Sequence, residues 1–224
     1  MKVSILQFPG TNCEYDTKYA FEKLGATTEI VWHKSETIPE DTNLLVVAGG
    51  FSYGDYLRSG AIAKFSPVMK AVKTYADAGG KVLGICNGFQ VLTESGLLPG
   101  ALKRNEHLHF ISKHHTLSVV NNDNIFLEKL ENGDVVNIPI AHHDGNYYID
   151  EDGLKDLEAN NQILLRYVDA NGDVKNPNGS VASIAGVCNK NKNVFGLMPH
   201  PERAMESLLG SDDGVKMLQG FFEA

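Results

Sequence analysis

Apolar segments of strand length alternate with segments of helical periodicity through the first half of the chain. The strand-like segments are residues 3–6, 29–32, 44–48 and 81–85. Residues 44–48 are apolar without interruption, which is typical of a strand covered by helices on both faces. Strands that alternate with helices pair in parallel through right-handed crossovers, so this half predicts an α/β sheet.

Capping residues mark the helices in this half. The apolar side chains of a first helix stop at Gly25. A second helix follows Ser66-Pro67 and ends at Gly79. A third is predicted between Cys86 and Gly96.

The second half has a different pattern, in which clusters of turn residues separate short strands. The strand candidates are residues 107–120, 135–140, 163–168, 181–187 and 194–198. Asn171-Gly172 suits a hairpin turn, and helices are predicted at residues 152–160 and 211–222. No repeat or linker divides the chain. We therefore expect a single domain over residues 1–224, with an open, mixed, mostly parallel sheet and helices on both faces.

The composition narrows the class of protein. The 224 residues include 20 basic and 28 acidic side chains, and the net charge of −8 argues against a nucleic-acid or membrane-surface partner. No apolar stretch approaches the roughly 20 residues of a membrane helix, and no secretory signal follows Met1. Cys13, Cys86 and Cys188 are too few for a disulfide framework, and their odd number favours a reducing compartment, so we expect a cytoplasmic protein.

The segment around Cys86 carries the clearest chemical signal. A predicted buried strand ends in Gly84-Ile85-Cys86-Asn87-Gly88, and a helix follows. This pattern is typical of a nucleophile elbow, a sharp strand-to-helix turn in which flanking glycines allow close packing. The helix N-terminus favours a thiolate, and the N–H of Asn87 would face a developing oxyanion. A buried structural cysteine gives the same pattern, so a second element is needed.

His200 is the candidate base for this nucleophile. It lies between Pro199 and Pro201, directly after the predicted strand 194–198, and sites gather at strand ends in open α/β sheets. Glu202 could accept a hydrogen bond from the ring and hold one tautomer, leaving the other nitrogen to face the thiol. A surface-loop histidine is the alternative for this segment alone.

A third element, Gly49-Gly50-Phe51, follows the predicted strand 44–48. Glycines at the carboxyl end of a parallel strand bring bare backbone N–H groups against a ligand. We therefore expect the N–H of Gly50 or of Phe51 to be a second oxyanion donor beside that of Asn87. A flexible loop between strand and helix is the alternative.

These motifs resemble those of class I (triad) glutamine amidotransferases. The residues that carry the resemblance are Gly84-Ile85-Cys86-Asn87-Gly88-Phe89-Gln90 and Pro199-His200-Pro201-Glu202. Further blocks are similar to the glutaminase subunits of phosphoribosylformylglycinamidine synthase in purine biosynthesis, namely residues 8–13, 49–58, 96–102, 178–180 and 196–203. The similarity runs from residue 3 to residue 220 and implies a flavodoxin-like fold.

The resemblance implies a reaction and assigns its residues. Cys86 would attack the side-chain amide of L-glutamine, while His200 takes and returns the proton and Glu202 orients His200. Ammonia leaves, and water hydrolyses the γ-glutamyl thioester.

By the same resemblance, main-chain N–H groups of Asn87 and of Gly50 or Phe51 would hold the oxyanion. Gln90 is implied to help place the substrate, although a glutamine on a helix face is more often simply solvated.

The resemblance also implies partners. Free ammonia protonates in water, so the family passes it through a closed channel to a large synthetase subunit that uses ATP and Mg. A small bridging subunit completes the complex. This chain has no G-x-x-x-x-G-K-[ST] phosphate loop, and we expect no cofactor or metal of its own.

Other segments carry weaker signals. Where the family has His-Gly-Glu-Gly, this chain has His142-His143-Asp144-Gly145, which leaves the role of that loop in docking or signalling open. His107 and His109 are expected to share one face of a strand, but no familiar zinc spacing completes a site. Cys13 lies near a helix start without a second element, so a structural role is expected.

Two other functional classes stay open on the residues alone. One is a different elbow-cysteine enzyme, a hydrolase or deglycase, and the other is a non-catalytic scaffold with the amidotransferase fold. His200 and Glu202 after a late strand argue against the first, because those enzymes lack a His-Pro-Glu there. The presence of Cys86 together with both residues argues against the second.

Overall fold

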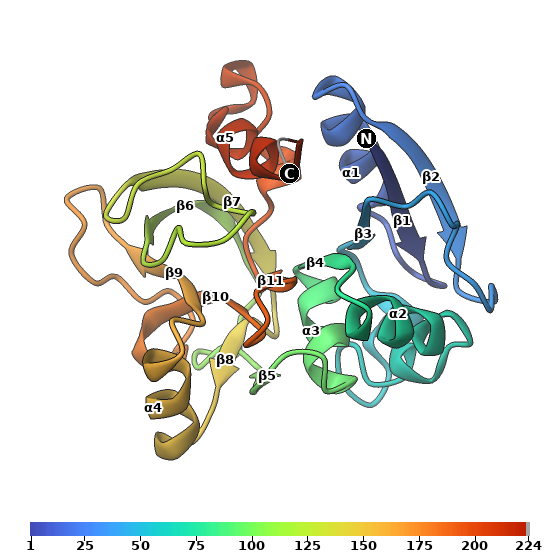
Figure 1. Cartoon of the computed structure of the whole chain (residues 1–224). Helices are drawn as coiled ribbons and strands as arrows, with labels where there is room; N and C mark the ends of the chain where they lie inside the picture. The colour runs from blue at the N-terminus through green and yellow to red at the C-terminus, as the bar shows by residue number, and fades with distance from the viewer. Residues whose placement is uncertain (223–224) are drawn as a thin grey trace.

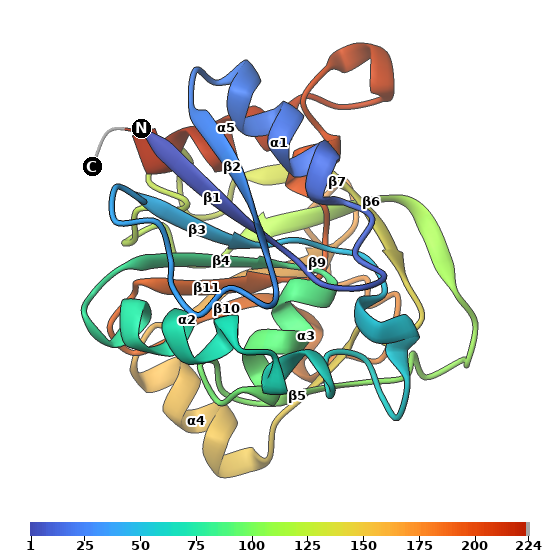
Figure 2. The same cartoon turned by 90° about the vertical axis from the view of Figure 1, so that its right-hand side faces the viewer.

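The computed structural model describes residues 1–222 and has a nine-stranded sheet with helices on both faces (Figures 1 and 2). The strand order is β2-β1-β3-β4-β11-β10-β9-β6-β7. The first five strands in this order pair in parallel, and the remaining pairs are antiparallel. The predicted α/β fold with a mixed sheet is therefore confirmed.

The strands of the parallel part come from both ends of the chain. They are β1 (Lys2–Gln7), β2 (Thr27–Trp32), β3 (Leu44–Val47), β4 (Lys81–Ile85) and β11 (Val194–Leu197). The antiparallel part comprises β6 (Ile111–Val119), β7 (Val135–His142), β9 (Ile163–Val168) and β10 (Ile184–Cys188). A separate two-stranded sheet pairs β5 (Ala101–Lys103) with β8 (Asn146–Tyr148).

Two groups of helices cover the sheet. In Figure 2, α1 (Glu14–Lys23) and α5 (Asp213–Gln219) lie on one face, and α2 (Val68–Asp77), α3 (Asn87–Glu94) and α4 (Glu151–Ala159) lie on the other. All four residues of β3 are fully buried, as its unbroken apolar run predicts. No helix among residues 1–222 is long and apolar enough to cross a membrane.

The strand predicted from residue 107 is wrong at its start, because β6 begins only at Ile111. The Nδ2 of Asn105 donates to the carbonyl groups of His109 and His142, at 2.9 and 3.0 Å, and this holds residues 104–110 as a loop. His107 and His109 therefore do not alternate on a strand, and their rings stack with centroids 5.7 Å apart.

Two further boundaries differ from the sequence prediction. Residues 181–183 form a 3-10 turn before β10, and the last helix is only α5 followed by another such turn at residues 220–222. At Asn171-Gly172 a turn does form, with the N–H of Gly172 donating to Asp169, but it is followed by a single bridge between Val168 and Val174.

The parallel register brings three strand ends together. Val47 of β3 is paired with Gly84 of β4, and Ile85 of β4 with Leu197 of β11. The segments that follow these strands consequently leave the sheet side by side. β1 lies beside β3, so the loop after β1 reaches the same edge.

Close packing of α3 against the sheet depends on two glycines. A Cβ at Gly88 would lie 1.8 Å from the carbonyl oxygen of Val47, and one at Gly84 would lie 2.5 Å from Cδ1 of Leu92. No side chain fits at Gly88 unless the helix moves away from β3.

We expect Gly88→Ala to lower the free energy of unfolding by more than about 3 kcal/mol, because the clash is with backbone that cannot repack. Gly96→Ala is the matched control at the other end of α3, where φ is +73° but the space is open, and it should cost only about 1 kcal/mol. Urea unfolding measures both values, and equal losses for the two variants would contradict this account of the packing.

Candidate active site

Cys86 sits at the sharp turn between β4 and α3. Its φ and ψ of 49° and −105° are a rare conformation for a residue with a side chain, and such strain is concentrated at functional sites. The N–H of Cys86 donates to the carbonyl of Leu197 at 2.8 Å, which ties the turn to β11. Only 6% of the residue is exposed. The nucleophile-elbow geometry expected from the sequence is thus present.

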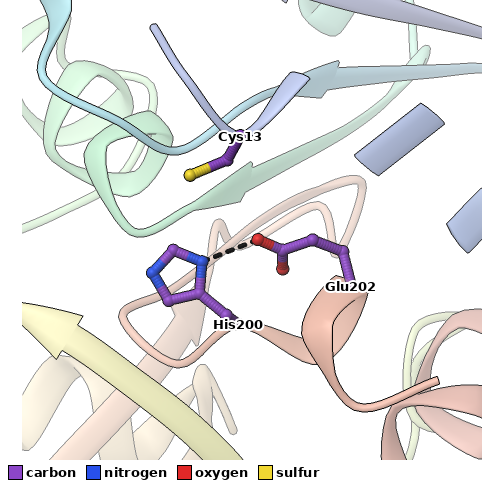
Figure 3. A group of neighbouring side chains, drawn as sticks. All are labelled: Cys13, His200 and Glu202. Carbon is purple, nitrogen blue, oxygen red and sulfur yellow. Dashed lines mark hydrogen bonds and ion pairs between the residues drawn. The ribbon is translucent and has the colours of Figure 1, made fainter. Parts of the chain in front are cut away.

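His200 and Glu202 form a buried pair after β11. Nδ1 of His200 lies 2.6 Å from Oε1 of Glu202, and both side chains are almost completely buried (Figure 3). Burial by itself lowers the pKa of the imidazole, but the Glu202 carboxylate and the Cys86 sulfur outweigh it and raise the pKa to about 10. The structure therefore brings the three predicted triad residues together.

Two backbone N–H groups close to Cys86 are candidate oxyanion donors, because Asn87 follows it in the chain and Gly50 lines the same cavity. The N–H of Asn87 opens α3, and neither it nor the N–H of Gly50 has an acceptor within residues 1–222. The N–H of Phe51 instead donates to the carbonyl of Gly10 at 3.0 Å. Of the two expected alternatives for the second oxyanion donor, Gly50 is available and Phe51 is not.

Only a glycine fits at position 50, in the loop after β3. Its φ is +133°, and a Cβ there would lie 2.5 Å from the backbone nitrogen of Asn12. Bare backbone is therefore required where the loop after β3 passes the loop after β1.

Gln90 is buried, contrary to the solvated glutamine usual on a helix face. Its Oε1 accepts from Nδ2 of Asn87 at 2.8 Å, and its Nε2 donates to the carbonyl of Asp144 at 2.7 Å. The Oδ1 of Asn87 accepts from the N–H of Ser52 at 3.0 Å. These bonds connect the elbow to the loop after β3 and to the loop after β7.

Residues 142–145, which depart from the family pattern, lie at the end of β7 and in the loop that Gln90 binds. Ser59 donates to Oδ2 of Asp144 at 2.8 Å, and Nδ1 of His143 lies 2.9 Å from Oδ1 of the same carboxylate. Burial lowers the pKa of His142 to about 3. Burial also raises the pKa of Asp55 to about 6, and the nearby charge of Asp144 raises it further. The sequence alone gave no sign that this loop adjoins the elbow.

Cys13 is the site residue that sequence reasoning missed. Its sulfur and ligand atoms of His200 and Glu202 all lie within 4.8 Å of one another, and Figure 3 shows the sulfur beside the pair. Its position could have been inferred from the strand order, because the loop after β1 lies at the same edge of the sheet as the elbow.

The same three residues are the one group in residues 1–222 whose spacing could hold a metal ion. Their chemistry does not fit one. Nη2 of Arg203 lies 3.0 Å from the sulfur of Cys13, so a cation would compete with a guanidinium. Burial and the Glu202 charge raise the pKa of the Cys13 thiol far above its usual range, so it is a neutral and therefore poor ligand.

A small cavity of about 120 Å³ opens onto these groups. It is lined by Asn12, Cys13, Gly50, Phe51, Cys86, Phe110, Ala141, His200 and Arg203. Cys86 and His200 form its buried part, and the half-exposed rings of Phe51 and Phe110 stand at its mouth. A larger hollow of about 800 Å³ lies along α2, at residues 64–74 and 94–97, and holds none of the residues of the elbow or the His200–Glu202 pair.

The chain is similar to known glutamine amidotransferases. The sequence of residues 1–214 matches the family of CobB/CobQ-like glutamine amidotransferase domains. Phosphoribosylformylglycinamidine synthase subunit PurQ of Sulfurimonas denitrificans is 80% identical over the full length of both chains. The protein of the same name from Wolinella succinogenes is 62% identical over 98% of this chain and 99% of its own.

Solved structures extend the comparison to three dimensions. A chain of PurLQS from Thermotoga maritima is 42% identical, with a TM-score of 0.89 over 99% of this chain and 97% of that one. Another glutamine amidotransferase from the same organism, 14% identical with a TM-score of 0.62 over 100% of this chain and 99% of its own, shares the fold. The chain therefore belongs to the CobB/CobQ-like glutamine amidotransferase family, among the PurQ subunits of phosphoribosylformylglycinamidine synthase.

Proposed function

We propose that this glutaminase subunit hydrolyses L-glutamine through a thioester on Cys86, with His200 as general base and acid and Glu202 as the group that orients His200. The observation that carries the proposal is the buried contact of 2.6 Å between His200 and Glu202, beside a cysteine on a strained turn. A nucleophile, a base and an orienting group in this order are what acyl transfer requires.

The reaction follows from these positions. With a pKa of about 10, His200 holds its proton below that pH, so the thiol proton of Cys86 already lies on the ring nitrogen that faces the sulfur when the sulfur attacks the amide carbon. The N–H groups of Gly50 and Asn87 stabilise the negative oxygen of the tetrahedral intermediate. His200 returns the proton to the amide nitrogen, the C–N bond breaks, and ammonia leaves a thioester behind.

Hydrolysis uses the same groups in the reverse order. Water attacks the thioester carbon as His200 takes its proton, the C–S bond breaks, and glutamate leaves with that proton still on His200 beside the free sulfur. Glu202 stabilises the imidazolium that forms in each half of the cycle. Gln90 holds Asn87, and thereby one oxyanion donor, in place.

The ammonia is proposed to pass to an ATP-dependent synthetase that converts formylglycinamide ribonucleotide to formylglycinamidine ribonucleotide. A large synthetase subunit and a small bridging subunit are the proposed partners, and ATP and Mg belong to the synthetase. The names of the relatives and the PurLQS structure support this assignment. We propose that the whole chain, residues 1–224, acts as one amidotransferase domain.

Exposed apolar side chains close in the sequence to the cavity-lining Phe51 and Phe110 support a partner that covers the site. Tyr56 and Leu57, on the same loop as Phe51, are 72% and 80% exposed, and Leu108, beside Phe110, is 64% exposed. Exposed apolar side chains that gather at one place mark contact surfaces. The three free cysteines support the proposed cytoplasmic location.

The alternatives are less well supported. A different elbow-cysteine hydrolase or deglycase would not explain the match to an amidotransferase family over residues 1–214. A scaffold without activity would not need a buried His200–Glu202 pair, which costs desolvation energy.

We expect Cys86→Ala to abolish glutamine-dependent synthesis by the assembled complex and to leave ammonia-dependent synthesis unchanged, because only the source of nitrogen is removed. Glutamate release and ATP consumption, each measured with glutamine and with ammonium salt, check this. Loss of both activities together would show that Cys86 has a structural role instead.

The pH profile tests the roles of His200 and Glu202. Because the proton on His200 is needed for the leaving ammonia, kcat/KM for glutamine should fall as the pH rises through about 10. Glu202→Gln removes a charge that raises this pKa, so the fall should begin at lower pH, with a rate reduced on the order of 100-fold or more.

His200→Ala is the companion variant and should cost several orders of magnitude in glutamine hydrolysis at neutral pH, more than Glu202→Gln costs. An unchanged alkaline limb in Glu202→Gln would remove Glu202 from the proposed mechanism.

A further inference from the structure

Arg203 brings a positive charge to the wall of the cavity. Apart from His200, it is the only basic side chain among those that line the cavity. About 34% of its side chain is exposed, against 2% for His200, so its guanidinium lies toward the open end. The wall is thus reactive at its buried end and cationic near the mouth.

The guanidinium is held in place with donors to spare. Its Nε donates to Oδ2 of Asp16 at 3.1 Å, and its Nη2 lies 3.0 Å from the sulfur of Cys13. A guanidinium has five N–H groups, so three of them have no acceptor within residues 1–222.

The partners of Arg203 leave much of its charge uncancelled at the cavity. The Cys13 thiol is neutral and a weak acceptor, and the Asp16 side chain is 49% exposed to solvent, which screens it. On the buried side, Glu202 and the Cys86 sulfur would repel a bound carboxylate. Arg203 is the group that offsets this repulsion.

L-Glutamine has the matching polarity. Its amide must reach Cys86, and its α-carboxylate then projects toward the mouth at the other end of a short aliphatic chain. Guanidinium groups bind carboxylates with paired hydrogen bonds of fixed geometry.

We propose that Arg203 binds the α-carboxylate of L-glutamine and so selects free glutamine over other carboxamides. This inference rests on the proposed function, since it assumes that the amide of glutamine lies at Cys86. Asp16 acts as the positioning residue that holds the guanidinium against the cavity wall.

Two electrophiles that differ at this group test the proposal. 6-Diazo-5-oxo-L-norleucine carries the α-carboxylate of glutamine, and iodoacetamide does not. We expect Arg203→Gln to slow alkylation of Cys86 by the first reagent on the order of 10- to 100-fold, the range for one lost charged hydrogen-bond pair. Alkylation by iodoacetamide should be unchanged, and Arg203→Lys should lie between wild type and Arg203→Gln.

Competition experiments give a second measurement. In the wild-type chain, L-glutamine should protect Cys86 from iodoacetamide at lower concentrations than L-glutamine α-amide does. In Arg203→Gln the two compounds should protect equally. The full chain is used alone and together with the synthetase subunits, and mass spectrometry identifies the labelled cysteine.

Arg166→Gln is the matched control. Arg166 is also 34% exposed and is also paired with one carboxylate, that of Glu158, but it does not line the cavity. Its variant should keep wild-type rates with both reagents.

Three results would overturn the proposal. A wild-type rate with the diazo reagent in Arg203→Gln would remove Arg203 from substrate binding. An equal loss with both reagents would show that Arg203 only maintains the surroundings of Cys86. Failure of both reagents to label Cys86 in the wild type would instead overturn the proposed nucleophile, and with it this assignment.

Discussion

The register of three parallel strands is the constraint on which the site depends. β3, β4 and β11 end side by side, and within three residues of each end lies one functional part: the bare backbone of Gly50, the sulfur of Cys86 and the imidazole of His200. A shift of one residue in any strand would turn its last side chain to the other face of the sheet. The close contact of Gly88 with Val47 fixes the position of the helix that follows Cys86, so the position of the nucleophile depends on this packing.

The electrostatics of the site follow from its burial. A carboxylate and an imidazole removed from water are costly unless each stabilises the other. Glu202 meets this cost by its contact with His200, and the Cys86 sulfur adds to the attraction. The same burial keeps Cys13 protonated although it lies against the pair. Two cysteines in one cavity thus differ in role because one lies at the elbow and the other among a carboxylate and a guanidinium.

Local sequence signals located much of this arrangement. Glycines at fixed spacing around Cys86, and prolines around His200, made both segments recognisable, and the apolar run of β3 placed Gly50 at a strand end. Contacts between distant segments could not be predicted in the same way. Neither the position of Cys13, the bond from Gln90 to Asp144, nor the use of the Phe51 N–H by Gly10 leaves a local pattern. The start of β6 was misplaced because Asn105 binds backbone from two other segments.

The strand that carries His200 to the site, β11, is the last strand of residues 1–222, yet it occupies the middle of the sheet, between β4 and β10. During synthesis the N-terminal strands emerge first, but the sheet cannot be completed until β11 has left the ribosome and inserted. Until then the thiol has no imidazole beside it. A chain that still lacks β11 therefore has Cys86 but not the imidazole that the proposed reaction needs.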